Sequence, residues 1–210
     1  MVERKFALTM KGASFIIETT MNGAGSVPKR GNMDFKQLIE VRESCRAYTG
    51  EPIDSKDLDA ILRAGRMSPS AKNTQPWKFY VVHNEKRDAL REAIKVMGFN
   101  KFVDQASAFI VIVADSTSVM DKLAKVVTSR DFIENDIGIA VASMSYQATD
   151  LGYGSCILGA FNGKEVCKAI GIDEKKANDV KLILAVGKRA TEEIRVKTRK
   201  DEGETTIFVD

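Results

Sequence analysis

Histidine and cysteine are scarce in this chain of 210 residues, and their scarcity excludes several kinds of catalytic site. The sole histidine, His83, ends an expected strand, so zinc sites and Ser-His-Asp triads are nearly excluded by the shortage of ligands. The three cysteines, Cys45, Cys156 and Cys167, show no metal-ligand spacing, and their odd number argues against a disulfide framework. We therefore expect no bound metal and a reducing, cytoplasmic setting.

Long apolar runs and an excess of one charge are also missing. The longest strongly apolar run, Phe109 to Ala114, is far shorter than the ~20 residues needed to cross a bilayer. Phe15-Ile16-Ile17 is too brief for the apolar part of a signal peptide, so we expect none. The net charge is +3 at pH 7, and basic residues are mostly interleaved with acidic ones. We therefore expect neither a membrane nor a nucleic acid as a partner.

The composition that remains fits a globular chain of ordinary size. Apolar residues make up 44% and charged residues 29% of the sequence, as in soluble globular proteins, and the length suits one domain with a real core. Residues 1–32 are rich in loop-forming glycine near their end, which indicates an N-terminal extension. We expect the main domain over residues 33–200 and a C-terminal tail over 201–210, where Thr205–Val209 has the composition of a last strand.

Apolar periodicity predicts helices and short strands along the main domain. Asp34 and Gln37 have capping-box spacing, and Gly152 is expected to end a long helix. Helices are expected from Asp34, from Asp54 or Ser55, from an Asn84 cap, from about Phe132 to Leu151, and over Val166–Ile170. Strands are expected at Phe15–Thr20, Lys78–Val82, Phe109–Ala114, Ser155–Leu158 and Lys181–Val186. Helices dominate and strands are short, which indicates a mixed α/β or α+β domain.

Arg42, Ser44 and Arg46 lie where the first expected helix loses its periodicity. If this segment is extended, alternation would put all three side chains on one side. Two guanidinium groups and a hydroxyl suit a phosphate, because Arg matches phosphate geometry with two parallel hydrogen bonds. The alternative is a solvated helix end, where cations complement the helix dipole. On the triplet alone, the helix end is the better interpretation.

The loop from Ser68 to Trp77 is the second candidate site. Its two prolines stiffen it, and Ser70 and Asn73 offer short hydrogen-bonding groups that suit the edge of a flat polar ring. The alternative is a plain helix-to-strand connection, with Pro and Asn as turn formers and Trp77 in the core. The loop by itself does not decide between them.

The segment from Gly152 to Gly159 combines a helix stop, a buried strand and a further glycine. Glycine lets a backbone approach a planar ligand. The segment is not a dinucleotide-binding fingerprint, because no strand precedes it and no long helix follows. Lys197-Thr198-Arg199-Lys200 could complete an anion site, although a run of charge is usually a solvated face. Cys156 is better interpreted as a buried, inert thiol than as a redox group.

Taken in order, these elements resemble the FMN-dependent nitroreductase family. Arg42-Glu43-Ser44-Cys45-Arg46 is similar to the family's Arg-x-Ser-x-Arg element, and Ser68–Trp77 is similar to its Pro-Ser-x-x-Asn-x-Gln-Pro-Trp loop. Gly152–Gly159 resembles its later glycine-containing segment, and Lys197-Thr198-Arg199 its closing basic element. The resemblance spans about residues 33–200, its stretch from Asn73 to Trp77 is quite specific, and residues 1–32 lie outside it.

The resemblance implies an α+β fold, with a mixed, mainly antiparallel sheet flanked by helices and with FMN at the interface of a homodimer. It implies that the FMN phosphate and ribityl chain are held by Arg42, Ser44, Arg46 and Arg199, with Lys197 nearby. Pro69, Ser70 and Asn73 would contact the flavin, the first two across the dimer interface. Ile157, Leu158 and Gly159 would lie by the ring, with the Gly159 N–H as a candidate donor to flavin N5.

The implied reaction is ping-pong. NADH or NADPH delivers hydride to FMN and leaves, and a nitroaromatic, quinone or similar acceptor then takes the electrons in the same pocket. No catalytic acid or base is needed, which agrees with a sequence of one histidine and no evident catalytic carboxylate pair. The region between Met97 and Phe132 has no recognisable acceptor signature, so the acceptor and the choice between NADH and NADPH are not evident. There, Phe99, Phe102 and Phe132 are expected to pack in the core rather than to form a lid.

Three alternatives remain beside this interpretation. A reductive dehalogenase or a flavin-consuming enzyme of the same fold would need specialised lid residues, which we do not find. A non-catalytic flavin- or nucleotide-binding module would keep the phosphate site but lose open access above the ring. A protein-interaction domain without a cofactor would be colourless when purified.

Overall fold

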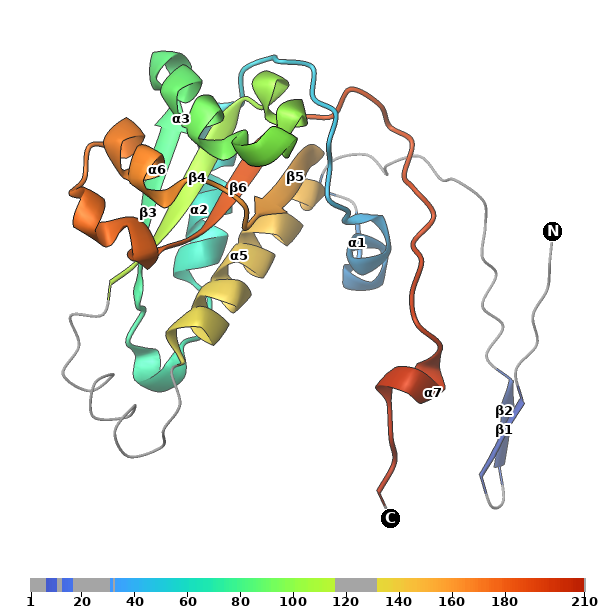
Figure 1. Ribbon diagram of the computed structural model, residues 1–210. Coiled ribbons are helices and arrows are strands. Elements are labelled where there is room, and N and C mark those ends of the chain that lie inside the picture. The colour runs from blue at the N-terminus through green and yellow to red at the C-terminus, as the bar shows by residue number, and fades with distance from the viewer. Residues whose placement is uncertain (1–6, 11–12, 17–30, 32, 116–131, 210) are drawn as a thin grey trace. The chain divides into compact units, whose positions relative to one another are not determined.

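The computed structural model describes residues 7–10, 13–16, 31, 33–115 and 132–209 (Figure 1). The chain divides into two compact units, one of residues 27–192 and the other of residues 1–26 with 193–210. In the smaller unit, β1 (Ala7–Met10) and β2 (Ala13–Ile16) form an antiparallel hairpin, and α7 (Glu202–Thr205) is a short helix. The larger unit holds the main sheet. The sequence-based division at residues 32 and 200 stays a prediction.

The main sheet consists of four antiparallel strands in the order β3-β4-β6-β5. Its strands are β3 (Trp77–His83), β4 (Ala108–Ala114), β6 (Val180–Lys188) and β5 (Tyr153–Leu158). Strand β4 pairs with β3 on one side and with β6 on the other. Its apolar run is continuous rather than alternating, because both of its faces are buried.

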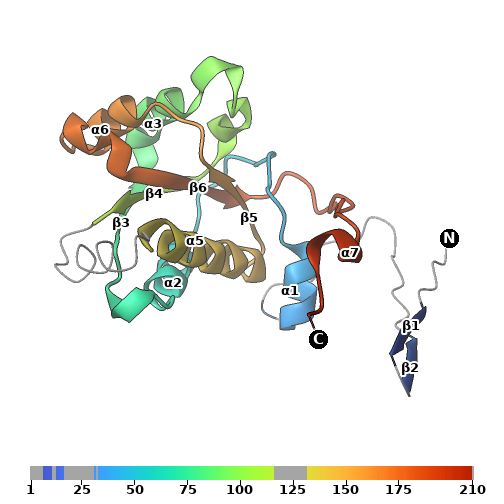
Figure 2. The same ribbon diagram turned by 60° about the horizontal axis from the view of Figure 1, so that its bottom comes forward.

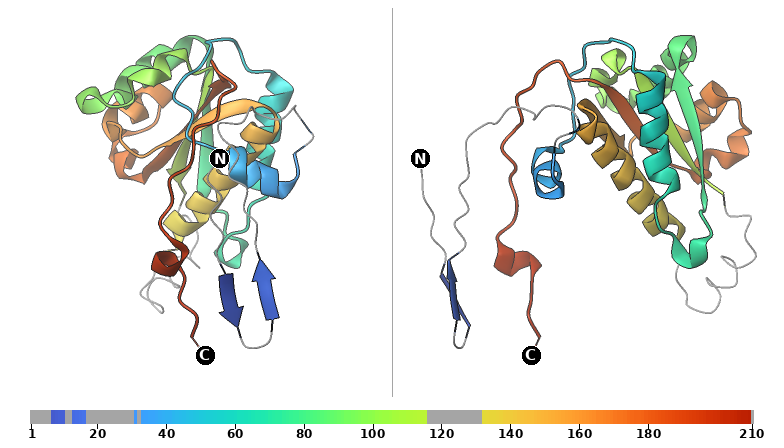
Figure 3. Two further views of the ribbon diagram at one scale, coloured as in Figure 1. Left: turned by 90° about the vertical axis from the view of Figure 1, so that its right-hand side faces the viewer. Right: turned by 180° about the vertical axis from the view of Figure 1, so that it is seen from behind.

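Helices cover both faces of the main sheet, as Figure 2 shows. α2 (Ser55–Arg66) and α5 (Ile133–Asp150) lie side by side on one face, which the rear view in Figure 3 shows clearly. α3 (Arg87–Ile94) and α6 (Gly163–Ile170) cover the other face, and α1 (Phe35–Val41) contacts α5. The short 3-10 helices are η1 (Ala71–Asn73), η2 (Asn84–Lys86), η3 (Val96–Gly98), η4 (Lys101–Gln105) and η5 (Glu174–Asp179).

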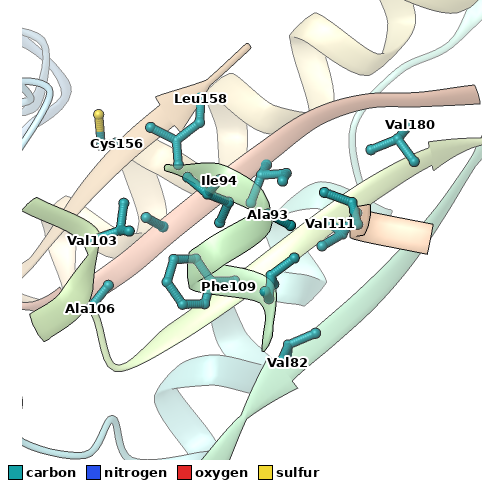
Figure 4. Close-up of a cluster of buried hydrophobic side chains, with 14 of the residues drawn as sticks. Val82, Ala93, Ile94, Val103, Ala106, Phe109, Val111, Cys156, Leu158 and Val180 are labelled. Atoms are coloured by element: carbon teal, nitrogen blue, oxygen red, sulfur yellow. The ribbon is translucent and has the colours of Figure 1, made fainter. Parts of the chain in front are cut away.

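The alternation of side chains along β4 divides the buried core into two clusters. Phe109 and Val111 point toward α3 and α6, where Figure 4 shows them with Ile94 and Val103. Ile110 and Ile112 belong to the other cluster, with residues of α2 and α5. The sheet is therefore packed against helices on both of its faces.

Several sequence-based predictions of the fold are confirmed. The Asp34 Oδ1 accepts the Gln37 N–H at 2.8 Å and the Gln37 Oε1 accepts the Asp34 N–H at 3.1 Å, which is the predicted capping box. Gly152 has a φ of +81°, two residues after the last residue of α5, and an L side chain would be strained there. The α+β fold with a mainly antiparallel sheet is confirmed as well.

Two local predictions are wrong. Asn84 does not cap α3, because the chain first makes the 3-10 turn η2 and the helix begins after Lys86. Residues 206–209 form no strand, and Thr205 is the last residue of α7. The first turn of α7 is capped by a hydrogen bond from the Asp201 N–H to Glu204 at 3.4 Å. The strand predicted at Phe15–Thr20 is seen as β2, which ends at Ile16, and residues 17–20 lie outside the described part of the chain.

Within the described part, no helix has the length and apolar character that a membrane span requires.

Candidate functional site

The segment from Arg42 to Arg46 follows α1 and runs along the edge of the main sheet. α1 ends at Val41, and Arg42 already has an extended backbone. Ser44 forms a parallel bridge with Ser155 of β5, and the Cys45 N–H donates to the Ser155 carbonyl at 2.9 Å. The segment is therefore an added edge to β5 rather than the solvated end of a helix.

The side chains of the two arginines stack on different aromatic rings. The Arg42 guanidinium lies 5.9 Å from the ring centre of Tyr146, on α5, and the Arg46 guanidinium lies 6.0 Å from that of Phe102, on η4. Tyr146 and Phe102 belong to opposite faces of the sheet, so the predicted common side for both arginines is wrong in this structure. The reason is local: Arg42 has polyproline-like angles, φ −61° and ψ 121°, which do not give the alternation of a pleated strand.

The loop from Ser68 to Trp77 is held in an unusual backbone conformation. Lys72, Asn73 and Gln75 have φ values of 53°, 55° and 48°, in the left-handed region that only glycine adopts without strain. Residues held in such conformations cluster at functional sites, and each costs about 1–3 kcal/mol. The strained backbone favours the interpretation of this loop as a site over that of a plain connection from α2 to β3, which stays a prediction.

Hydrogen bonds inside the loop fix the groups predicted to contact flavin. The Gln75 N–H donates to the Ser70 Oγ at 2.9 Å, and the Gln75 side-chain amide donates to the Asn73 Oδ1 at 3.2 Å. Trp77, which follows, is buried and stacks on Phe79 with ring centres 6.0 Å apart. The predicted burial of Trp77 is therefore confirmed, and it anchors the end of the loop.

Asp136 is a residue that the sequence did not single out. It is buried in the first turn of α5, and its two carboxylate oxygens accept the Ala71 N–H at 3.1 and 3.2 Å. This contact joins the loop to the helix across 65 residues of chain. Its position directly before the apolar Ile137 was the only sequence signal that could have revealed it.

The end of β5 offers an open stretch of backbone. Leu158 is buried in the core, while Ile157 and Gly159 are exposed. A Cβ on Gly159 would meet no atom within 4 Å, so the space beside this backbone is free for a planar group. The Asn100 side-chain amide donates to the Ala160 carbonyl at 2.9 Å and fixes the chain that follows.

The remaining predicted residues lie elsewhere in the chain. Lys197 and Arg199 belong to the smaller unit, and their predicted role in phosphate binding stays a prediction.

The three cysteines are all buried and form no disulfide. Phe102 is half-buried against the core, but Phe99 is exposed, so its predicted packing in the core is wrong. Among the described residues, no group of three or more His, Cys, Asp or Glu side chains is arranged to hold a metal ion.

Two cavities of the described chain, of about 610 and 320 Å³, lie along β3. The larger is lined by β3, η2 and the end of α6, the smaller by β3 and the start of α2. Neither is lined by a residue that we predict to bind flavin. Of those residues Leu158 is buried in the core, and the others lie on exposed or half-buried surface.

Comparison with known proteins establishes the family. A model of the nitroreductase family matches residues 39–99 and 92–188, which is most of the larger unit. This chain belongs to the nitroreductase family. The resemblance predicted from the Arg42–Arg46, Ser68–Trp77 and Gly152–Gly159 elements is thereby confirmed, and all three lie within the matched residues. Lys197 and Arg199 lie beyond them.

Similar nitroreductase-family proteins come from several microbes. A protein of Archaeoglobus fulgidus, named as a candidate NADH dehydrogenase/NAD(P)H nitroreductase, is 34% identical over 134 residues, covering 64% of this chain and 72% of the relative. An oxygen-insensitive NADPH nitroreductase of Helicobacter acinonychis is 28% identical over 207 residues, covering 83% and 96%. The solved structure of an FMN-dependent nitroreductase from Clostridium difficile has a TM-score of 0.64 at 25% identity, covering 82% of this chain and 98% of the other.

Proposed function

We propose that this nitroreductase-family protein is an FMN-dependent oxidoreductase, which uses NADH or NADPH to reduce a nitroaromatic, a quinone or a similar acceptor. The observation that carries the proposal is the bridge between Ser44 and Ser155. It places the arginine-bearing segment beside β5, two residues before Ile157–Gly159. Groups suited to a phosphate and a backbone open to a flat ring thereby share one edge of the sheet.

The donor groups on this edge fit the parts of FMN. Arg42, Ser44 and Arg46 would bind the phosphate and ribityl chain, because guanidinium groups match phosphate geometry and charge. For both arginines to reach one phosphate, at least one would have to leave the aromatic ring against which it lies in this structure. The family resemblance also assigns Lys197 and Arg199 to the FMN phosphate. The space beside the Gly159 backbone is free, so the flavin ring would lie there, with the Gly159 N–H as the candidate donor to N5. When bound, FMN supplies the ring that takes up and passes on the hydride.

The Ser68–Trp77 loop contributes positioning. Ser70 and Asn73 are ordered by their hydrogen bonds to Gln75 before any ligand arrives. Pro69 is exposed at the tip of the same loop, where it can meet a ring or a second subunit. Such pre-organisation reduces the ordering cost of binding.

A homodimer is part of the proposal, and α5 supports it. The helix carries no charged residue from Ile137 to Thr149, although one of its faces is turned away from the core. On that face Ile139 is 43% exposed, and Phe35 of the neighbouring α1 is 70% exposed. Exposed apolar side chains grouped on an uncharged surface are typical of an interaction surface. A second copy of this chain, packed on the same face, would cover it.

The geometry of α5 also supports a site shared between two subunits. The loop is attached at Asp136 near the start of α5, whereas Arg42 stacks on Tyr146, ten residues further on. Ten residues of α-helix span about 15 Å. If a two-fold axis pairs the α5 helices in antiparallel fashion, the loop of one subunit lies toward the Arg42–Arg46 segment of the other. Pro69 and Ser70 would then contact flavin across the interface, as the resemblance implies.

Initial-rate kinetics test the proposed reaction. We expect NADH or NADPH oxidation that depends on an added quinone or nitroaromatic, with parallel double-reciprocal plots when both concentrations are varied, because the donor leaves before the acceptor binds. Intersecting plots would contradict the ping-pong order. Absence of turnover in a protein that holds flavin would instead favour a non-catalytic flavin-binding module. The cytoplasmic setting stays a prediction.

A further inference from the structure

A buried ion pair ties the arginine-bearing segment to the end of β6. The Arg189 Nη2 donates to the Glu43 Oε1 at 2.5 Å, and both side chains are only 9% exposed. Its side chains are far less exposed than those of surface ion pairs such as Glu51–Lys188, and it joins positions 146 residues apart. A buried ion pair usually adds little stability, because desolvation of both charges offsets their attraction. Its presence therefore calls for another role.

The backbone around the pair shows what it fixes. From Cys45 onward the segment is held by main-chain hydrogen bonds, with the Ala190 N–H donating to the Ala47 carbonyl at 3.0 Å and the Thr49 N–H donating to the Lys188 carbonyl at 3.1 Å. Glu43 lies ahead of these bonds, between Arg42 and Ser44. The ion pair thus extends the attachment to the part of the segment that carries the predicted phosphate-binding groups.

Gly154 of β5 makes room for this attachment. A Cβ at Gly154 would lie 2.5 Å from the Cys45 Sγ and 3.1 Å from the Arg189 Cγ, so a side chain there would push both neighbours away. The close approach of Cys45 and Arg189 to the strand depends on the absence of that side chain. Three separate parts of the chain therefore meet at the pair.

We propose that Glu43 and Arg189 are positioning residues, which hold Arg42 and Ser44 in place for the FMN phosphate. The inference rests on the proposed function. Glu43 carries a negative charge next to the groups that would bind a dianionic phosphate, and this charge alone would weaken phosphate binding. A carboxylate beside Arg42 is compatible with phosphate binding if Arg189 offsets its charge and the ion pair fixes the position of the segment. Neither residue contacts the phosphate itself.

The opposite signs of these two effects provide the test. Glu43→Gln removes the charge and keeps the shape, so a purely electrostatic role predicts tighter FMN binding. A positioning role predicts FMN binding about tenfold weaker, because the buried ionic contact between Glu43 and Arg189 is lost and the segment loosens. Riboflavin, which lacks the phosphate, should bind with nearly the same affinity to both proteins. The quantity to measure is the ratio of the riboflavin and FMN dissociation constants, from flavin fluorescence quenching of the apoprotein.

The exposed ion pair between Glu51 and Lys188 provides a matched control. It joins the same two parts of the chain, but its side chains are 55% and 48% exposed. Glu51→Gln should leave the riboflavin-to-FMN ratio within about twofold of the wild-type value, as expected for a surface pair. An equal fall of the ratio in both variants would show a general charge effect and overturn the proposal.

The outcomes separate this inference from the proposed function. A wild-type protein that prefers FMN, with a fall of the ratio in Glu43→Gln only, supports the positioning role. The same preference for FMN in wild type and in Glu43→Gln overturns the inference and leaves the proposed function intact. A wild-type protein that binds neither flavin overturns both. If Glu43→Gln does not fold, Glu43→Asp is measured instead; it shortens the side chain by one methylene group. A fall of the riboflavin-to-FMN ratio in Glu43→Asp supports the positioning role, and an unchanged ratio overturns it.

Discussion

The carboxylate of Asp136 accepts the backbone N–H of Ala71, and through this one contact the first turn of α5 holds the loop before β3. Three residues of that loop have left-handed backbone angles, so contacts with other elements are needed to stabilise its conformation. Buried Trp77 secures its far end. Asp136 therefore links the long central helix to the loop that we expect at the flavin.

Asp136→Ala is expected to destabilise the protein by about 1–3 kcal/mol, because the part-buried Ala71 N–H loses its acceptor. Asp136→Asn keeps the size and one acceptor oxygen, and we expect a smaller loss. Urea unfolding of the three proteins measures both effects. An Ala variant as stable as the Asn variant would contradict the anchoring role of this carboxylate.

Arg42→Ala combined with Arg199→Ala is expected to release FMN, because it removes two charge-assisted contacts worth about 1.5–3 kcal/mol each. The flavin-to-protein ratio after gel filtration measures the loss. Arg66→Ala, on the exposed surface of α2, is the control and should keep its flavin. Full occupancy in the double variant would show that the phosphate lies elsewhere.

Ile139→Lys is expected to dissociate the dimer, because it places a charge in the middle of the uncharged outer face of α5. If the flavin site is shared between subunits as proposed, the monomer should also lose FMN. Lys164→Glu, on exposed α6, changes charge away from this face and should remain dimeric. Sedimentation velocity over a dilution series follows both variants. An active, flavin-bound monomer would contradict the shared site.

The free energy of unfolding is expected to fall at alkaline pH because of Tyr48. Burial, and after it the neighbouring Cys45 thiol, raises the pKa of Tyr48 well above its ordinary value of about 10. Below pH 10 the phenol is protonated in the folded and the unfolded chain, so the stability from its burial is fully present. Above pH 10 only the unfolded chain releases the proton readily, so this stability is lost as the pH rises.

Tyr48→Phe checks this dependence. At pH 7 the variant should be about 0.5–1.5 kcal/mol less stable, because the Tyr48 hydroxyl no longer donates to the Cys45 carbonyl, a contact of 3.0 Å. The difference from wild type should shrink between pH 10 and 11, since only wild type loses stability through this group. A difference that stays constant in urea unfolding over this range would show that Tyr48 does not titrate as described.

Local patterns in the sequence predicted the elements of the fold well. The Asp34 cap, the glycine after α5 and the apolar run of β4 depend on neighbouring residues, so their signals are visible in the chain itself. The nitroreductase resemblance was likewise carried by short motifs, above all Asn73 to Trp77.

Contacts between distant residues could not be predicted in the same way. Nothing in the spacing of the chain shows that Asp136 meets Ala71 or that Glu43 meets Arg189, because these pairs form only once the helices and strands have packed. The direction of the Arg42 side chain was also missed, since it depends on the backbone angles of a single residue at a helix end.

The most direct test of the account is an absorption spectrum of the purified protein, reconstituted with FMN where needed, followed by anaerobic addition of NADH or NADPH. We predict the bands of a bound flavin, which bleach on addition of at least one of the two nucleotides. A colourless protein that takes up no added FMN would contradict the cofactor assignment on which the function rests. Bound flavin that neither nucleotide reduces would contradict the proposed oxidoreductase activity.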